Sequence, residues 1–570
     1  MRNLTEVSLK NKVLVWYFIL VTAIGGIFCY NKLGRMEDPQ FTIREMVVSA
    51  AWPGATAEEM QEQVTDKLEK KLQDTRGLDH IKSETRAGQT VIYVDLADDV
   101  EKSAIREIWH DVRNLCEAEK RELPSGVYGP FYNDRFDDVY GSVYAVTGDG
   151  YSYEEMREAA ENTRRLLMQV PSVQKVELLG EQEEKVYVEV KTAKLSELGI
   201  SPQAVLQALK AQNEMTAAGK LETATDSVYL RVTGTFEDVD DIKALPVSAN
   251  GRSFRLGDIA TVRRTSVDPA QPKMFLDGAP AIGIAVSMQD GGNILQLGDD
   301  LKKEIAAAQE NLPVGLEIHQ VSDQPSVVNH SIHDFVKTLA EAIVIVLAVS
   351  FLSLGLRTGL VVAGCIPLVL AGTFVVMYAA GISLHKVSLG SLIIALGLLV
   401  DDAIIAVEMM SVKLEMGNSR FDAACYAFRA TAKPMLTGTL ITCCGFIPVA
   451  FAKGMASEFC SALFPVIATA LLLSWIVSVM VAPLYGYYLI RVEVKKDAEG
   501  HIDPYQSRFY TWFRKVLTIF LTHRKVVLIA TAGVFFLSLF MMTFIKQEFF
   551  PPSLRPEILV ELKLPEGSSM

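Results

Sequence analysis

Long apolar runs alternate with short polar segments along the second half of this chain, and one further apolar run lies near its start. Runs of roughly 18 to 23 residues are long enough to cross a bilayer as helices. The pattern predicts seven membrane spans, at residues 13–30, 335–356, 359–378, 387–407, 435–451, 463–485 and 526–545. The first has no small-x-small cleavage site, so we expect it to remain as an anchor.

Residues 31–334 hold no apolar run of that length and instead alternate strand and helix patterns. Two helix starts are marked by capping boxes, in which Thr56 precedes Glu59 and Ser152 precedes Glu155. The strand-like segments are 45–52, 90–96 and 142–146, and residues 173–190 are predicted as a hairpin. Repeated β-α-β units of this length predict ferredoxin-like α+β subdomains that stand side by side.

Composition agrees with a membrane protein that has a large polar part. Half of the 570 residues are hydrophobic, yet 22% are charged, and the net charge is −13. A pure membrane bundle would carry less charge, and no basic face favours nucleic acid as a partner. Of the seven cysteines only Cys116 lies in the polar part, so no disulfide framework is expected there.

Lysine and arginine beside the spans predict the orientation. With the N-terminus in the cytoplasm, the short outer loops hold only Lys386 and Lys453, as the positive-inside rule favours. The polar part of about 300 residues then lies outside the inner membrane, in the periplasm of a bacterium. Residues 506–522 are predicted to form an amphipathic helix on the cytoplasmic surface, and we interpret it as a linker between two halves of a bundle.

Two adjacent acids, Asp401 and Asp402, interrupt the apolar run at 387–407. An ionised Asp at the bilayer centre costs roughly 2.5–3.5 kcal/mol on insertion scales, so the pair must serve a function. Intramembrane carboxylates face a bundle interior or a wet cavity and most often serve ion or proton pathways. The pair therefore predicts an ion-driven membrane transporter.

Enzyme and nucleotide chemistry find little support in the sequence. No Walker-type loop is present, which fits transport driven by an ion gradient. No Ser-His-Asp, HExxH or Cys-His arrangement occurs in a setting that would support catalysis. We expect a secondary active transporter without a cofactor, and not an enzyme.

An internal repeat relates residues 512 positions apart. Pro39, Glu45 and the residues at 53–55 align with Pro551, Glu557 and the residues at 565–567, and the first span aligns with the seventh. A duplicated transporter would continue with a second polar domain and further spans. We expect the chain to be the first half of a protein about twice as long.

Several motifs occur in order along nearly the whole chain. They are Ala51-Trp52-Pro53-Gly54-Ala55, residues 198–201 followed by Gln212-Asn213 and Ala218-Gly219, residues 256–262, Val336-Lys337-Thr338-Leu339 with Glu341, and Gly397 with Asp401-Asp402. Together they resemble the resistance-nodulation-division (RND) superfamily, and within it the hydrophobe/amphiphile efflux branch, which supplies inner-membrane pumps of tripartite drug-efflux systems.

The resemblance implies a fold and a domain plan. The fold is an α-helical transmembrane bundle with an α+β periplasmic porter domain built from ferredoxin-like β-α-β repeats. The implied parts are a first span at 1–30, a first porter subdomain at 31–133, a second at 134–177 and 268–334, a docking region at 178–267, spans two to six at 335–490, a cytoplasmic linker helix at 491–525, a seventh span at 526–545 and the start of a second periplasmic domain at 546–570.

The resemblance also assigns site residues. Asp401 and Asp402 match the family's paired proton-relay aspartates, whose partner lysine and polar residues lie in the second half. Glu341 and Glu408 match further acids of the relay, although Met409 stands where the family usually has Asn, and for Glu341 a snorkelling pair with Lys337 is an equal alternative. Tyr140 and Leu179 align with positions that line the family's drug pocket, and ordinary strand core is the alternative for both.

Partners and alternatives follow from the same resemblance. A pump of this branch works with a periplasmic adaptor (membrane fusion protein) and an outer-membrane channel, forms a homotrimer in the lipid membrane and exports amphiphilic small molecules. The protruding arm of the docking region, at 217–232, is shorter than in well-known drug pumps. This predicts a weaker interlock between the three subunits of the trimer. A metal-ion exporter of the superfamily stays open, with His330 and His333 as a weak pair. An inactive half that needs its second half is the third interpretation.

Overall fold

A computed structural model describes residues 3–136, 138–214, 217–231, 235–249, 251–491, 508–546, 557–562 and 564. The repeat partners predicted at Pro551 and at 565–567 lie outside this part, as do most of the linker at 492–507 and most of 546–570. The chain divides into two compact units. Unit 1 comprises residues 1–141, 287–299 and 323–560, and unit 2 comprises 142–286, 300–322 and 561–570.

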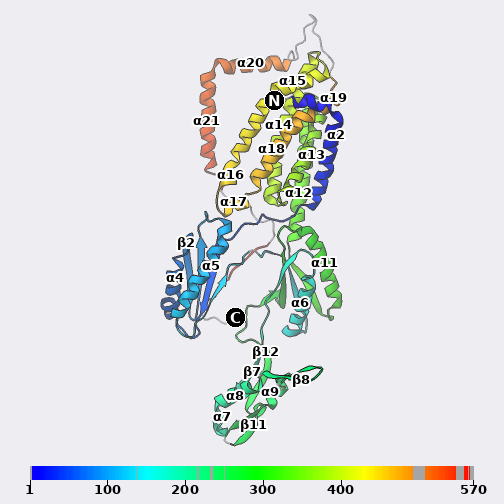
Figure 1. Ribbon diagram of the computed structural model, residues 1–570. Coiled ribbons are helices and arrows are strands. Elements are labelled where there is room, and N and C mark those ends of the chain that lie inside the picture. Colours follow the sequence, from blue (N-terminus) through cyan, green and yellow to red (C-terminus); the bar gives the residue numbers. More distant parts are fainter. Residues whose placement is uncertain are drawn as a thin grey trace. The chain divides into compact units, whose positions relative to one another are not determined.

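Unit 1 contains the apolar helices (Figure 1). Their bounds are α1 (Leu4–Lys10), α2 (Lys12–Lys32), α12 (Gln324–Leu354), α13 (Leu356–Ala379), α14 (Lys386–Glu415), α15 (Arg420–Gly445), α16 (Ile447–Phe451), α17 (Met455–Phe459), α18 (Leu463–Met480), α19 (Ala482–Leu489), α20 (Arg508–Thr522) and α21 (Arg524–Met542). Helix α14 packs against α13, α15 and α18, while α2 packs on α13. Gly26 allows the latter contact, because a Cβ there would lie 2.4 Å from that of Ala371.

Five stretches of the described residues are long and apolar enough to cross a membrane: Lys12–Lys32, Leu356–Ala379, Lys386–Glu415, Met455–Leu489 and Arg524–Met542. They overlap five of the seven predicted spans and fit a multi-pass membrane protein. The spans predicted at 335–356 and 435–451 fall mainly in α12 and in α15 with α16, and these two stay predictions.

Helix α15 begins well before the apolar run that predicted it. Its N-cap is Ser419, whose side chain accepts a hydrogen bond from the backbone N–H of Asp422. The helix then continues through Pro434 and ends at Gly445, shortly before Pro448. Hydropathy located only the second half of α15, because its first half is too polar to register as a span.

The first sheet, also in unit 1, is a β-α-β-β-α-β unit. Its elements are β1 (Glu45–Ala51), α3 (Ala57–Met60), a π-helical turn (Gln61–Thr65), α4 (Asp66–Leu72), β2 (Leu78–Arg86), β3 (Gln89–Leu96), α5 (Lys102–Glu119), a 3-10 turn (Lys120–Glu122) and β4 (Tyr128–Asn133). The strand order is β2-β3-β1-β4, the ferredoxin-like arrangement that the sequence predicted. Side chains of β1 and β3 that alternate toward the helices, among them Met46, Val48, Ile92 and Val94, form the core with α4 and α5.

Unit 2 holds most of a five-stranded sheet. Its strands run in the order β13 (Met274–Leu276), β14 (Ala279–Met288), β5 (Tyr140–Gly148) and β15 (Leu316–Asp323), and β6 (Val173–Leu179) pairs with β14 off this path. Helix α6 (Tyr153–Leu167) lies in unit 2, whereas α11 (Ile294–Asn311) begins in unit 1 and ends in unit 2. Helix α6 begins at the capping box of Ser152 and Glu155 that the sequence predicted.

The hairpin predicted at 173–190 is wrong. Strand β6 belongs to the five-stranded sheet, whereas β7 (Glu184–Val190) pairs antiparallel with β12 (Ala260–Ser266) in a separate ribbon. The chain leaves the five-stranded sheet after β6 and enters the ribbon at β7. The buried side chain of Gln182 anchors the segment that joins these two strands. Its amide donates to the carbonyls of Gln271 (3.1 Å) and Pro272 (3.3 Å), and its oxygen accepts from the N–H of Gln271 at 3.0 Å.

The β7–β12 ribbon leads to a small insert in unit 2. Its elements are α7 (Thr192–Leu198), α8 (Pro202–Gln212), β8 (Ala217–Glu222), β9 (Ser227–Arg231), α9 (Val239–Ala244), β10 (Pro246–Ala249), β11 (Arg252–Arg255) and α10 (Leu256–Ile259). Strands β8 and β9 pair within the predicted arm. Leu195, Ile200, Val247 and Leu256 form part of the insert's own hydrophobic core.

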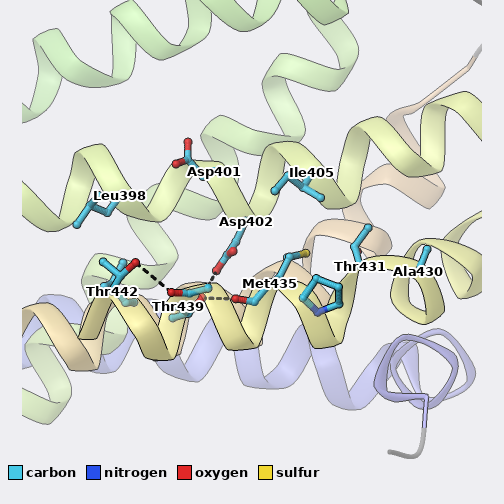
Figure 2. Close-up of a pocket in the computed structure, with 12 residues that line it drawn as sticks. Leu398, Asp401, Asp402, Ile405, Ala430, Thr431, Met435, Thr439 and Thr442 are labelled. Carbon is cyan, nitrogen blue, oxygen red and sulfur yellow. Dashed lines mark hydrogen bonds between the residues drawn. The ribbon is translucent and has the colours of Figure 1, made fainter. Parts of the chain in front are cut away.

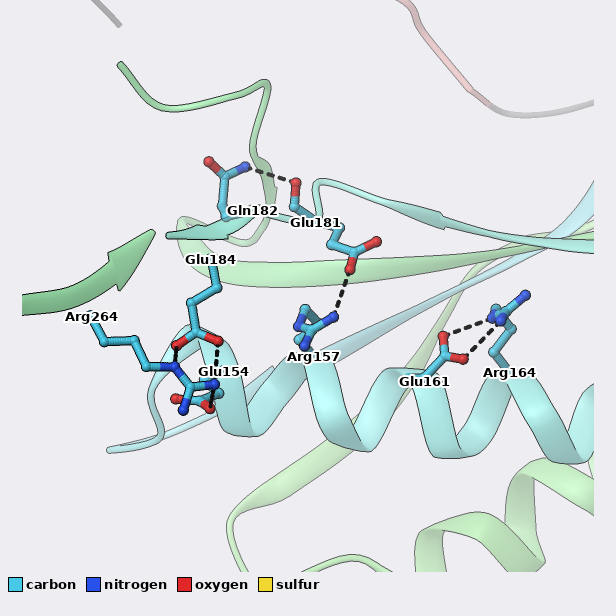
Figure 3. A network of polar contacts seen from close by, with 8 residues as sticks. All are labelled: Glu154, Arg157, Glu161, Arg164, Glu181, Gln182, Glu184 and Arg264. Carbon is cyan, nitrogen blue, oxygen red and sulfur yellow. Dashed lines mark hydrogen bonds and ion pairs between the residues drawn. The ribbon is translucent and has the colours of Figure 1, made fainter. Parts of the chain in front are cut away.

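Ion pairs connect the base of the ribbon to α6. Arg264 on β12 lies 2.6 Å from Glu184 and 3.2 Å from Glu154 of α6, and Arg157 lies 3.1 Å from Glu181 (Figure 3). We call the hydrogen bonds of Gln182 with Gln271 and Pro272 the clamp. The clamp and these ion pairs cross-link the two chain segments that enter and leave the insert.

Candidate membrane carboxylate site

Helix α14 presents the acidic pair. It begins at Lys386, and its N-cap is His385, whose ring accepts a hydrogen bond from the N–H of Ser388 in a capping box. Asp401 and Asp402 follow in the middle of this helix. Adjacent residues on an α-helix point about 100° apart, so the two carboxylates face different neighbours.

The two aspartates have distinct surroundings. The Asp402 side chain points toward α15, where Thr439 Oγ1 lies 3.3 Å from Asp402 Oδ2 (Figure 2). Asp401 points away from Thr439 and is exposed in this chain. Thr439 Oγ1 also lies 2.9 Å from the carbonyl of Met435. A hydroxyl has one proton to donate, so Thr439 can bond either to its own helix or to the carboxylate.

A cavity of about 400 Å³ lies beside the pair. Its walls come from α14, α15 and α18: Leu398, Asp401, Asp402, Ile405, Ala430, Thr431, Pro434, Met435, Gly438, Thr439, Thr442 and Leu471. Among these described lining residues there is no Lys, Arg or His. The described lining therefore holds threonine hydroxyls, of which that of Thr439 donates to Asp402, but no countercharge.

Glycines on α14 leave room for another element. A Cβ at Gly390 or Gly397 would meet nothing within 4 Å in this structure. Gly438, on α15, is equally open. Small residues at such positions allow a further helix to approach the backbone closely.

Helix α18 is hydrogen-bonded to α14 next to the pair. Ser474 Oγ donates to the carbonyl of Leu399 at 2.7 Å, and Ser474 is buried. Trp475, the next residue, donates from Nε1 to the carbonyl of Ala432 on α15 at 3.0 Å. Consecutive side chains of α18 thus link both helices that carry the carboxylates and their hydroxyl donor.

The structure does not bring the other predicted residues to this cavity. Glu341 on α12 and Glu408 on α14 are exposed, and neither is among the described residues that line it. Tyr140 is half-buried at the start of β5, and Leu179 ends β6 with 38% exposure. The surroundings of Leu179 include Met274 and the backbone at Gly283.

Sequence reasoning missed a segment that contacts the N-terminal ends of two helices, α12 and α14. We call residues 34–44 the strap. Its Glu37 accepts from Gln324 at the start of α12 (3.1 Å) and lies 3.0 Å from Lys386 at the start of α14. The strap also pairs its backbone with Leu384, since Leu384 N–H donates to Gly34 and Met36 N–H donates to Leu384.

The far end of the strap contacts α17. Arg44 lies 2.6 Å from Glu458, and the N–H of Thr42 donates to the same carboxylate at 2.8 Å. Acidic and basic residues beside the spans were the only signal in the sequence, and they do not specify which residues pair. Thr439 and Ser474 gave no signal, because isolated hydroxyls are common in apolar helices.

Comparison with known proteins places the chain among membrane transporters. Residues 4–570 match the family described as AcrB/AcrD/AcrF. The chain is 27% identical over 544 residues to the multidrug resistance protein MdtC of Pantoea ananatis, covering 93% of this chain and 52% of that protein. It is 27% identical over 481 residues to MdtC of Yersinia enterocolitica, covering 83% of this chain and 46% of that protein.

An uncharacterized transporter of Haemophilus influenzae is 25% identical over 545 residues, covering 93% of this chain and 52% of that protein. The chain thus spans about half the length of the curated relatives it matches.

Proposed function

The chain belongs to the AcrB/AcrD/AcrF family of RND transporters, and on this premise we propose that the complete protein is a proton/substrate antiporter that exports amphiphilic compounds. The observation that carries the proposal is the pair Asp401 and Asp402, set beside a cavity whose described lining has hydroxyl donors and no countercharge. Relatives that match 83% and 93% of this chain are named multidrug resistance proteins, which supports drugs as substrates.

Proton uptake would change the packing at this site. An ionised Asp402 attracts the Thr439 hydroxyl and any cation brought to the cavity by a further helix. A protonated Asp402 has no charge to hold that cation, and Thr439 can return to the carbonyl of Met435. The helix that carries the cation is then released, so protonation becomes a movement of α14 and α15 relative to it.

The membrane potential supplies the driving force. A proton that moves through a potential of 100 mV releases about 2.3 kcal/mol, and it gains access to the pair through the cavity. In this proposal Glu341 and Glu408 serve the same proton path from positions away from the cavity. The open backbone at Gly390 and Gly397 supports the approach of a second-half helix.

The polar parts have proposed roles as well. The first sheet at 31–133 and the second at 134–177 with 268–334 act as porter subdomains in the periplasm, and the insert at 178–267 docks to other pump components. Tyr140 and Leu179 contribute to the substrate pocket. An adaptor, an outer-membrane channel and a homotrimer in the inner membrane complete the pump.

Drug susceptibility tests this function. The complete gene, with its adaptor, is expressed in an efflux-deficient Gram-negative strain beside Asp401→Asn and Asp402→Asn variants. Both substitutions remove a charge while they keep the side-chain volume. We expect resistance to be lost in both at equal membrane expression.

Asp422→Asn is the matched control, because Asp422 lies in the first turn of α15 and outside the cavity. It should leave resistance unchanged. Resistance retained in the Asp401 and Asp402 variants would overturn the relay and move the coupling site elsewhere.

A further inference from the structure

A proline interrupts the helix that adjoins the carboxylate site. Helix α18 ends at Met480, α19 begins at Ala482, and Pro483 follows. Proline has no N–H, so it cannot donate to the carbonyl four residues earlier, which is that of Val479. Val479 is buried, and a carbonyl left without a donor inside a membrane bundle is costly.

The short helix α1 supplies the missing donor. Thr5 Oγ1 donates to the carbonyl of Val479 at 2.6 Å. One turn further along α1, Ser8 Oγ donates to the carbonyl of Met480 at 2.6 Å. Thr5 is 0% exposed and Ser8 is 1% exposed, so water does not compete for these bonds.

Other contacts fix α1 in this place. Asn3 caps α1 by accepting from the N–H of Glu6, and its amide donates to the carbonyl of Cys425 on α15 at 3.3 Å. Leu4 packs against the cluster of Phe428, Ala432 and Val479. Helix α1 therefore lies across α15 and the end of α18, two of the three helices that form the cavity beside Asp402.

We propose that α1 is a brace for the carboxylate site: Thr5 and Ser8 hold the proline break of α18 and α19, and thereby keep Ser474 against Leu399 and α15 against α14. Thr5 and Ser8 are positioning residues, since they contact neither carboxylate. The link from the brace to proton-coupled export rests on the proposed function, whereas the hydrogen-bonded brace itself does not.

The test combines Thr5→Val with Pro483→Ala in the full-length protein. Thr5→Val keeps the shape and removes the donor to Val479. Pro483→Ala adds a backbone N–H at the position that donates to the same carbonyl, so it should make the Thr5 hydroxyl dispensable. Thr5→Ser keeps the hydroxyl and serves as the conservative variant.

Hydrogen–deuterium exchange of the segment 476–490 measures how often the backbone N–H groups around the break open. We expect Thr5→Val to raise exchange by about fivefold, the loss of one net hydrogen bond. Thr5→Ser and the double variant Thr5→Val with Pro483→Ala should exchange like the parent protein. Thr373→Val is the matched control, because Thr373 is equally buried but donates to Val369 within its own helix.

The brace would be overturned if Thr5→Val exchanged no faster than Thr373→Val, or if Pro483→Ala did not restore slow exchange.

Export is measured in the same variants as a function of pH. A positioning role predicts that Thr5→Val shifts the pH profile and that Pro483→Ala restores it, and an unshifted profile would overturn that role. If the Asp401→Asn and Asp402→Asn variants still export, the proposed function fails, and the exchange result alone decides on the brace.

Discussion

The guanidinium of Arg44 lies 2.6 Å from the carboxylate of Glu458. Arg44 immediately precedes β1, the strand between β3 and β4 in the first sheet, and Glu458 lies in α17 between α16 and α18. The Arg44 side chain is 5% exposed, and it also donates to the carbonyl of Val100 at 3.1 Å. The pair thus joins the first sheet to the helices within unit 1 through a contact in which Arg44 is buried and Glu458 is partly exposed.

We expect Glu458→Gln to destabilise the protein, because it leaves the charge of Arg44 buried without its partner. Breaking a buried pair from one side costs several kcal/mol, and the partial exposure of Glu458 reduces this to roughly 2 kcal/mol. Thermal unfolding of the detergent-solubilised protein measures the effect. Glu84→Gln is the control, since its pair with Arg86 is 57% exposed on both sides and should contribute almost nothing.

Thr439→Val should impair export. The substitution keeps the shape of the side chain and removes the hydroxyl that donates to Asp402. The bond is long, at 3.3 Å between the two oxygens, so it contributes about 1 kcal/mol. We therefore expect the export rate to fall roughly fivefold. Export of a fluorescent substrate from whole cells provides the measurement.

Thr442→Val controls for the loss of a hydroxyl from the same cavity. Thr442 lines it too but donates to the carbonyl of Gly438 on its own helix. Equal impairment by the two valine variants would contradict a specific role for Thr439.

Gln182→Leu should loosen the connection between the five-stranded sheet and the insert. It leaves the carbonyls of Gln271 and Pro272 and the N–H of Gln271 without their partner, at a cost of about 1–3 kcal/mol. Limited proteolysis at 266–273 should become faster. Gln203→Leu, on the exposed surface of α8, should leave the proteolysis rate unchanged, and a similar increase there would argue against the clamp.

Glu45→Gln should alter the pH dependence of stability. Glu45 lies opposite Asp95 across β1 and β3, and burial, with the charge of Asp95, raises the pKa of Glu45. In the window just above its ordinary pKa, the folded state keeps a proton that the unfolded state has lost. Stability therefore falls as pH rises through the raised pKa.

The Gln variant has no proton to lose, so it should be more stable than the parent at pH 7.5 and not at pH 4. The gain is less than about 1 kcal/mol, because Glu45 is partly solvated. Thermal unfolding at the two pH values checks this. A gain of equal size at both would contradict electrostatic strain as its cause.

Much of the architecture follows from local pattern. Apolar runs of bilayer length placed α2, α13, α14, α18 and α21, since hydrocarbon tolerates only helices with few charges. Capping boxes marked the starts of α3 and α6 because Thr56 and Ser152 satisfy N–H groups within their own first turn. The cost of charge in a membrane singled out Asp401 and Asp402 as the candidate site, with no knowledge of their neighbours.

Only the tertiary structure decided what those residues contact. Strand β6 pairs with β14 and β7 with β12, although both strands looked like one hairpin, because pairing depends on segments far away in the chain. Thr439 beside Asp402, Arg44 beside Glu458 and Thr5 at the break made by Pro483 are likewise long-range. Composition and periodicity determine which elements form and where charge is costly, whereas the partner of each polar group depends on packing between helices and strands distant in sequence.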